Sequence, residues 1–381
     1  MDKHNILVID SDMATQIWLG NLLTSHGYQM DGVQNGKEGL EKLSTYSDGS
    51  IEIPALVIID LELVDLTGEE VINIYRNNPT LGEIPIIVFS KRQDLLEISR
   101  LFQMGISDYV TKKPGIENEL LGKISSSMLR AQTGDAMNKK GKLISFFSAK
   151  GGNGTSTICL NLAHCLAENV SPKKVLVVDL VLPIGSIAIM TGTQHENSIA
   201  NMTAEVKPHD THKLKSFLLP VENWSVSILP GSESVKESQK LEPSRIVPIL
   251  NSLLRAFDYV FVDLGKTLST ISQSVMNFSE LIAVVVSPDL LTAELTQIAV
   301  GHLNQIAIDR ENIFLIMNRA VGLAGLTKLE MEEKIGLKIQ RTVPYARENF
   351  TLTTNKHMPY ISQFKNDGIS IELQNLAEML E

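Results

Sequence analysis

A glycine-rich segment near the middle of the chain has the residue types of a phosphate-binding loop. The segment reads Lys150-Gly151-Gly152-Asn153-Gly154-Thr155-Ser156-Thr157, and it stands between an apolar run and an amphipathic stretch. Glycines let the backbone turn tightly and direct its N–H groups at an anion, and a following helix adds the positive end of its dipole. A hydroxyl at the start of that helix, here Ser156, can bind Mg²⁺ beside the phosphates. We therefore predict that this loop binds phosphate groups.

The loop lacks the lysine that a standard phosphate-binding loop places just before that hydroxyl. Thr155 occupies the position, and a different lysine, Lys150, opens the loop. This arrangement resembles the deviant Walker A loop of the MinD/ParA ATPase family, written KGGxGK[ST], and the resemblance covers residues 142–381. It implies ATP and Mg²⁺ as ligands, a homodimer with ATP between the subunits, and a Lys150 that reaches across to the partner's nucleotide.

Further residues match this family in the expected order. The resemblance implies that Asp179 is the first acid of its DxD motif and that Asp263 holds Mg²⁺ through water, with Ser156 as the other metal residue. The second acid, which orients the attacking water in the family, is Val181 here. The remaining contacts, near the base and on the adenine, are expected at Asn318, Arg319, Pro344 and Tyr345.

Thr155 and Val181 decide the expected chemistry. Phosphoryl transfer depends on charge neutralisation and on a positioned water, and these two positions lack the lysine and the carboxylate that would supply them. We therefore expect ATP binding with slow or absent hydrolysis, so that the protein is at most a weak ATPase. The nucleotide would then act mainly to hold a dimer together.

A second set of chemistry-bearing residues stands at expected strand ends in the first half: Asp10, Asp60, Ser90 and Lys112. Over residues 3–130 the chain resembles response-regulator receiver domains, in which two adjacent acids bind Mg²⁺ and a strand-end Asp accepts a phosphoryl group. The second acid is Ser11 here, and an ideal strand would point Asp12 in another direction unless the loop geometry restores it. Fewer anionic oxygens weaken Mg²⁺ binding. We expect a docking surface, with phosphorylation of Asp60 as the alternative.

Apolar periodicity predicts an α/β protein with two doubly wound parallel sheets. In the first half, expected strands at 6–9, 28–33, 56–59, 84–89 and 108–110 alternate with helices at 14–25, 37–43, 69–76, 95–104 and 117–129. In the second, short Val- and Ile-rich runs typical of strands covered on both faces lie at 143–147, 175–178, 259–262, 281–286 and 313–317. The expected domains are a flavodoxin-like receiver at 1–130, a polar linker at 131–141 and a P-loop ATPase domain at 142–381. Residues 194–240 show no clear pattern.

Charge and hydropathy weigh against nucleic acid and membrane as direct partners. The 381 residues carry a net charge of −10; residues 1–140 hold 13 basic and 20 acidic side chains, and residues 141–381 hold 21 and 24. Neither half has the basic excess that DNA binding usually needs. No apolar run approaches the ~18 residues of a membrane-spanning helix. The helical pattern at 369–380 places Ile371, Leu373, Leu376 and Leu380 on one side. It has no lysine or arginine to favour a membrane surface, so we expect it to pack on its own domain.

The order of the two halves gives the most specific expectation. A receiver-like domain followed by an ATPase domain with this loop resembles the TadZ/CpaE group, whose members position Tad (Flp, type IVb) pilus machinery at a cell pole. The resemblance implies other pilus assembly proteins as partners and a cytoplasmic protein concentrated at a pole through them. The alternatives are a ParA-like partitioning ATPase that acts on DNA and a phosphorylation-regulated ATPase.

Overall fold

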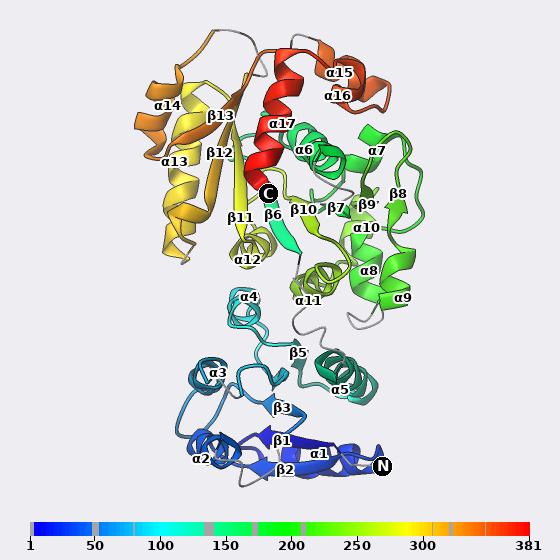
Figure 1. The fold of residues 1–381 in the computed structure, drawn as a ribbon, viewed down its shortest axis with the longest axis vertical. Helices are drawn as coiled ribbons and strands as arrows, with labels where there is room; N and C mark the ends of the chain where they lie inside the picture. Colours follow the sequence, from blue (N-terminus) through cyan, green and yellow to red (C-terminus); the bar gives the residue numbers. More distant parts are fainter. Residues whose placement is uncertain are drawn as a thin grey trace. The chain divides into compact units, whose positions relative to one another are not determined.

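The chain divides into two compact units, Met1–Lys139 and Lys140–Glu381 (Figure 1). The computed structural model describes residues 4–47, 53–78, 81–132, 141–169, 174–206, 211–306, 308–319, 322, 324–346 and 348–381. Most of the expected linker, residues 133–140, therefore lies outside the described residues.

The first unit is a doubly wound parallel sheet, as predicted. Along the chain its elements are β1 Asn5–Ile9, α1 Met13–Ser25, β2 Gln29–Val33, α2 Gly36–Ser47, β3 Leu56–Ile59, α3 Gly68–Arg76, β4 Ile86–Ser90, α4 Leu95–Gln103, β5 Asp108–Thr111 and α5 Glu117–Gln132. The described strands are ordered β2-β1-β3-β4-β5, and each neighbouring pair is parallel. This order is that of flavodoxin-like folds, in which ligands bind at the carboxyl ends of the strands.

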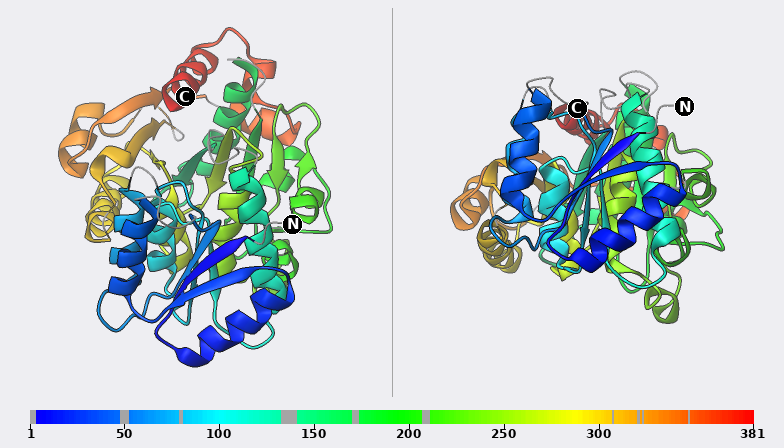
Figure 2. Two further views of the ribbon diagram at one scale, coloured as in Figure 1. Left: turned by 60° about the horizontal axis from the view of Figure 1, so that its bottom comes forward. Right: turned by 90° about the horizontal axis from the view of Figure 1, so that it is seen from below.

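Helices cover both faces of this sheet (Figures 1 and 2). On one face, Leu19 of α1 and Leu120 of α5 join a buried cluster with Val8 and other strand residues. On the other face, Gly39 of α2 packs directly on Ile9, the next residue of β1. Because successive strand residues point to opposite faces, the fully apolar strands of this unit are buried on both sides.

The second unit contains all five strands predicted for it and further elements that the pattern did not reveal. In chain order these are β6 Lys142–Phe147, α6 Thr155–Asn169, β7 Val175–Asp179, α7 Ile187–Thr191, α8 Ile199–Glu205, α9 Thr211–Ser216, β8 Leu219–Pro220, β9 Ser227–Leu229, α10 Val235–Ser238, α11 Pro243–Leu253, β10 Tyr259–Asp263, α12 Thr270–Phe278, β11 Leu281–Val286, α13 Leu290–Gln305, β12 Ile313–Asn318, α14 Lys328–Ile335, β13 Ile339–Val343, α15 Asn349–Asn355, α16 Tyr360–Gln363 and α17 Gly368–Leu380. The described strands form one sheet in the order β13-β12-β11-β6-β10-β7-β9-β8. Only β8 among them is antiparallel to its neighbour.

The C-terminal helix packs on its own unit, as expected. α17 lies against α6 and β13, and Leu373, Leu376 and Leu380 are buried there. The expectation that Ile371 shares this side is wrong, because Ile371 is 51% exposed and Ile369 is buried in its place. The helical period puts residues 369, 373, 376 and 380 on one stripe and leaves position 371 on the opposite side.

Candidate functional site

The glycine-rich loop lies at the carboxyl end of β6, in the middle of the second sheet. Residues 148–154 connect β6 to α6. Gly152 and Gly154 have φ angles of +85° and +83°, a region that favours glycine. A Cβ on Gly154 would lie 2.6 Å from Nδ2 of Asn318, so a side chain would not fit there. The loop backbone therefore carries no side chains of its own at residues 151, 152 and 154, which leaves its N–H groups able to face an anion.

Two buried asparagines hold the shape of this loop. The Asn153 side chain donates from Nδ2 to Oγ of Ser148 (2.7 Å) and accepts at Oδ1 from Oγ of Ser287 (2.8 Å). Asn318 donates from Nδ2 to the carbonyl oxygen of Asn153 (2.9 Å). Both asparagines were predicted as nucleotide contacts. In the structure their side chains form hydrogen bonds with other residues of the protein.

Asp263 ends β10, the strand beside β6, and is fully buried. Its Oδ1 accepts from the N–H of Gly265 (3.0 Å), whereas Oδ2 has no hydrogen-bond partner among the described residues. Burial and then the charge of Asp179 raise the pKa of Asp263 to about 7, while Ser156 and Gly265 act in the opposite direction. An orphaned carboxylate oxygen beside a hydroxyl is a suitable donor set for a hard cation. Ser156 and Asp263 thus fit the predicted Mg²⁺ ion.

Asp179 ends β7 and shapes the segment that follows it. Its Oδ1 accepts from the N–H of Val181 (3.0 Å), and its Oδ2 accepts from the N–H groups of Ser186 (2.7 Å) and Ile187 (2.9 Å). Burial raises the pKa of Asp179 although these bonds lower it. Asp179 connects to the loop through Ser186, whose Oγ lies 3.3 Å from Oγ of Ser156. A direct contact of Asp179 with nucleotide stays a prediction.

The two unusual positions of the loop region carry uncharged side chains. Thr155 starts α6 and is almost completely buried. Val181 packs against the turn after β10, because a Cβ on Gly265 would lie 3.3 Å from both of its methyl groups. Neither residue can neutralise a phosphate or orient a water by charge.

Lys150 forms an ion pair within its own chain. Its Nζ lies 3.0 Å from Oδ2 of Asp289, and about a third of each side chain is exposed (34% and 33%). Asp289 also caps α13, accepting from the N–H (3.0 Å) and the hydroxyl (2.7 Å) of Thr292. Asp289 was not predicted as a site residue; an Asp just after a strand and just before an apolar helix is a capping pattern that indicates such a position. The expected reach of Lys150 to a partner stays a prediction.

The last predicted contacts lie at the same edge of the sheet. The N–H of Arg319, just after β12, donates to the carbonyl oxygen of Val343 (3.1 Å), the last residue of β13. Pro344 and Tyr345 follow Val343 and are exposed. Thr157 is half-buried in the first turn of α6. The carboxyl ends of the parallel strands thus gather every predicted residue of this site.

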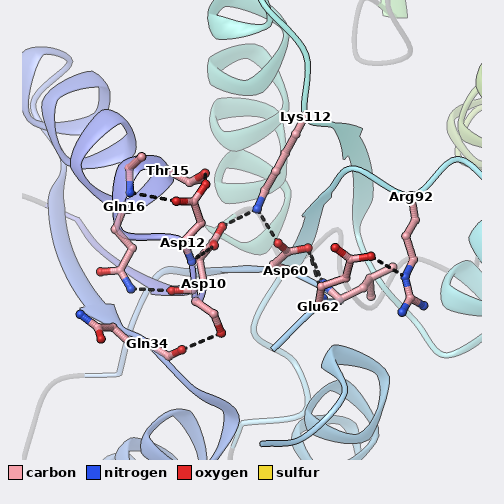
Figure 3. Close-up of polar contacts among 12 residues, drawn as sticks. Asp10, Asp12, Thr15, Gln16, Gln34, Asp60, Glu62, Arg92 and Lys112 are labelled. Atoms are coloured by element: carbon pink, nitrogen blue, oxygen red, sulfur yellow. Dashed lines mark hydrogen bonds and ion pairs between the residues drawn. The ribbon is translucent and has the colours of Figure 1, made fainter. Parts of the chain in front are cut away.

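A second cluster lies at the carboxyl edge of the first sheet, where Lys112 bridges Asp10 and Asp60 (Figure 3). Nζ of Lys112 lies 2.7 Å from Oδ2 of Asp10 and 2.5 Å from Oδ2 of Asp60, and all three side chains are buried. Burial raises the pKa of Asp10. Burial lowers the pKa of Lys112, but its bonds to the two carboxylates outweigh this and raise it overall. Ser90, predicted with them, is buried at the end of β4, and its hydroxyl has no hydrogen-bond partner among the described residues.

The carboxylates of this cluster do not fit a Mg²⁺ ion in this arrangement. Both carboxylates bind Lys112 through Oδ2. Oδ1 of Asp10 accepts from the N–H of Asp12 (2.9 Å), and Oδ1 of Asp60 accepts from the N–H of Leu61 (2.7 Å). The ammonium group of Lys112 therefore takes the place in which a cation would neutralise the two acids.

Asp12 does not restore the acid that is missing at Ser11. Its carboxylate caps α1, accepting from the N–H of Ala14 (3.0 Å) and the hydroxyl of Thr15 (2.8 Å), and these bonds, that of Thr15 first, lower its pKa (Figure 3). The Ser11 hydroxyl donates to the carbonyl oxygen of Gln34 (2.8 Å). Both side chains thus support the loop after β1 instead of holding a metal.

Comparisons with known proteins match each unit separately. The family model "response regulator receiver domain" matches residues 6–125, and the model "AAA domain" matches residues 141–313. The septum site-determining protein MinD of Thermotoga maritima is 25% identical over 251 residues, which are 63% of this chain and 88% of MinD. The transcriptional regulator ycf27 of Cyanidium caldarium is 30% identical over 145 residues, 38% of this chain and 54% of ycf27.

Solved structures give the same fold for the second unit. A ParA family ATPase from Chlorobium tepidum matches with a TM-score of 0.59 and 22% identity, over 63% of this chain and 99% of that one. MinD of Pyrococcus horikoshii, solved with Mg-ADP, matches with a TM-score of 0.55 and 22% identity, over 63% and 96%. The chain joins a receiver domain to a MinD/ParA-type ATPase domain. None of the helices among the described residues of either domain is long and apolar enough to cross a membrane.

Proposed function

We propose that the protein is an ATP-binding, dimeric localisation factor whose ATPase domain uses nucleotide mainly for assembly. The observation that carries this proposal is the orphaned Oδ2 of Asp263, buried beside Ser156 at the start of the helix that follows the glycine-rich loop. Calorimetric titration of the whole protein with ATP, with and without Mg²⁺, tests it. We expect saturable binding that depends on Mg²⁺, and Asp263→Asn should remove that dependence. Equal binding with and without the metal would contradict the assignment.

Hydrolysis should be slow, because Thr155 and Val181 supply neither a cation nor a water-orienting carboxylate. Loss of one such group typically lowers a rate by about 10²- to 10⁴-fold. Release of inorganic phosphate from ATP by the purified protein tests this. Turnover near ~1 s⁻¹, the low end for ordinary enzymes, would contradict the proposal.

Dimer formation should depend on ATP and on Lys150. In the MinD/ParA family, which this loop resembles, the corresponding lysine contacts the nucleotide of the partner subunit. Here Lys150 must leave Asp289 to do so. Sedimentation velocity with and without ATP should show a dimer for the wild type and a weaker one for Lys150→Ala. Unchanged sedimentation of Lys150→Ala in the presence of ATP would count against a lysine that acts on the partner's nucleotide.

The cellular role that we propose is that of the TadZ/CpaE group, positioning Tad (Flp, type IVb) pilus machinery at a cell pole. A receiver domain whose two strand-end acids both bind Lys112 supports this role as a docking surface. A fluorescently tagged protein, expressed with and without the other pilus components, tests whether polar positioning needs them. Retention of the purified protein on DNA in a salt-dependent manner would favour a ParA-like partitioning role instead.

A further inference from the structure

The ATPase domain carries an unassigned lysine beside its phosphate loop. A Cβ built on Gly151 would lie 3.3 Å from Cδ and 3.6 Å from Nζ of Lys266, so the Lys266 side chain extends across the loop at this glycine. Lys266 is exposed, and it takes part in no hydrogen bond or ion pair with the residues that the structure describes. Its ammonium group is therefore available to an anion held by the loop.

The backbone around Lys266 is tied to the loop. Lys266 comes three residues after Asp263, and the intervening Gly265 accepts at its carbonyl oxygen from the N–H of Ser148, the first residue of the loop (2.9 Å). The N–H of Gly265 donates to Oδ1 of Asp263 (3.0 Å), and Gly265 has a φ of +61° that favours glycine. The turn therefore fixes the base of Lys266 next to both the loop and the carboxylate that fits the metal.

The charge balance of the site calls for a cation at this place. A triphosphate with Mg²⁺ still carries negative charge, and Thr155 does not supply the lysine that usually meets the β- and γ-phosphates. Lys150 is held by Asp289 of its own chain. We infer that Lys266 binds the phosphates of the nucleotide within its own subunit and replaces the lysine that is absent at Thr155.

The test compares ATP affinities of the whole protein by calorimetry in Mg²⁺ at low salt. Lys266→Met keeps the apolar stem and removes the charge, so ATP binding should weaken by about 10- to 100-fold, the range for one hydrogen bond to a charged group. Lys266→Arg should retain most of the affinity. The matched control is Lys338→Met: Lys338 is also exposed but precedes β13, at the opposite end of the parallel strands, and this change should leave the affinity as it is.

A rescue experiment distinguishes phosphate binding from a structural effect. Adding Thr155→Lys to Lys266→Met should restore ATP affinity, because it returns a cation to the usual position. Equal ATP affinity of Lys266→Met and wild type, or an equal loss in Lys338→Met, would overturn the role of Lys266. Because this role requires the proposed nucleotide binding, the wild type is titrated first: failure of the wild type to bind Mg-ATP sinks the proposed function, whereas binding that survives Lys266→Met sinks only this inference.

Discussion

At the scale of single residues, one lysine binds both strand-end acids of the receiver domain. Lys112 binds Asp10 and Asp60 inside a buried cluster, so removal of one partner would leave an uncompensated buried charge. Ser11 adds no negative charge that could hold a divalent ion against this lysine. We therefore expect weak binding of the divalent cation on which phosphoryl transfer to Asp60 would depend.

Introducing an acid at Ser11 should restore the missing ligand. We expect Ser11→Asp to increase Mg²⁺-dependent phosphorylation by acetyl phosphate, because a second carboxylate would help a Mg²⁺ ion compete with Lys112 for the acids. Intact-mass spectrometry measures the added phosphoryl group, and Ser11→Asp with Asp60→Asn is the control that should remain unlabelled. Full labelling of the wild type would show that the native cluster already supports the reaction.

In the ATPase domain, two substitutions should convert binding into turnover. Thr155→Lys adds a cation at the usual position in the loop, beside the one that we infer at Lys266, and Val181→Asp returns a carboxylate near the attacking water. Together we expect them to raise the hydrolysis rate by about 10²-fold or more, given the usual contribution of each kind of group. Phosphate release measures the rate, with Val181→Asn as the uncharged control. A double variant as slow as the wild type would place the defect elsewhere in the site.

The sequence predicts strand-end residues better than it predicts their partners. Asp10, Asp60 and Asp263 could be found because they end apolar runs, and the carboxyl ends of parallel strands meet at one edge. The contacts of Asp289 and Lys266 depend on how the segments after β11 and β10 lie against the glycine-rich loop. Hydrophobic periodicity carries no information about the conformation of such segments. Asp12 was identified as a residue, but its role as a cap became clear only from the loop after β1.

At the scale of elements, one buried ion pair fastens α5 to β5 in the receiver domain. Nζ of Lys123 lies 2.7 Å from Oδ1 of Asp108 and 2.6 Å from the carbonyl oxygen of Tyr109, and Lys123 is only 1% exposed. We expect Lys123→Met to destabilise this domain by roughly 3–5 kcal/mol, because it leaves Asp108 charged and buried. Urea unfolding followed by circular dichroism measures the loss, and Lys123→Met with Asp108→Asn should recover part of it. A single variant as stable as the wild type would show that water reaches Asp108.

A buried histidine on α6 should make the ATPase domain sensitive to acid. Nδ1 of His164 accepts from the N–H of Ser225 (3.1 Å), and the ring meets Trp224 edge-on at 5.6 Å. Burial lowers the pKa of His164 below 6.5, against the charge of Glu168. Below about pH 6.5 His164 therefore binds a proton more readily in the unfolded chain than in the folded one. The free energy of unfolding falls as the pH drops through this range.

Thermal unfolding of the whole protein at pH 7.5 and 5.5 measures this effect. His164→Asn keeps an acceptor for Ser225 without a titrating ring, so the ATPase transition should shift less between the two pH values than in the wild type. His302→Asn, on α13, is the matched control and should retain the wild-type shift. Equal shifts for wild type and His164→Asn would show that other groups dominate the acid response.

Helices and strands can be predicted from the sequence where burial on both faces makes a segment apolar throughout. The central strands read as unbroken apolar runs because helices cover both sides of each sheet. β13 escaped prediction because only Ile339 and Val343 of its five residues are buried, as expected for an edge strand. Residues 194–240 contain short helices and the two-residue β8, which lack the length that periodicity needs.

At the scale of the whole molecule, the ion pair between Lys150 and Asp289 competes with the proposed dimerisation. A lysine that binds Asp289 in its own chain must give up that contact before it can bind a phosphate in another chain. With a third of each side chain exposed, water and salt screen the pair, so its contribution is small, about 0–1 kcal/mol. Dimerisation should therefore respond to Asp289 by a modest factor and not as an on–off switch.

Asp289→Asn tests this competition without removing the cap of α13, since asparagine caps helices as well as aspartate does. We expect dimerisation at lower ATP concentration, by up to about fivefold for each released pair, the equivalent of about 1 kcal/mol. Sedimentation velocity across an ATP series measures the midpoint. Asp94→Asn, at the cap of α4 in the receiver domain, is the matched control and should not move it. A weaker dimer for Asp289→Asn would contradict this competition. It would mean that Asp289 supports the interface, and that Lys150 keeps its contact with Asp289 while it binds the partner's phosphates.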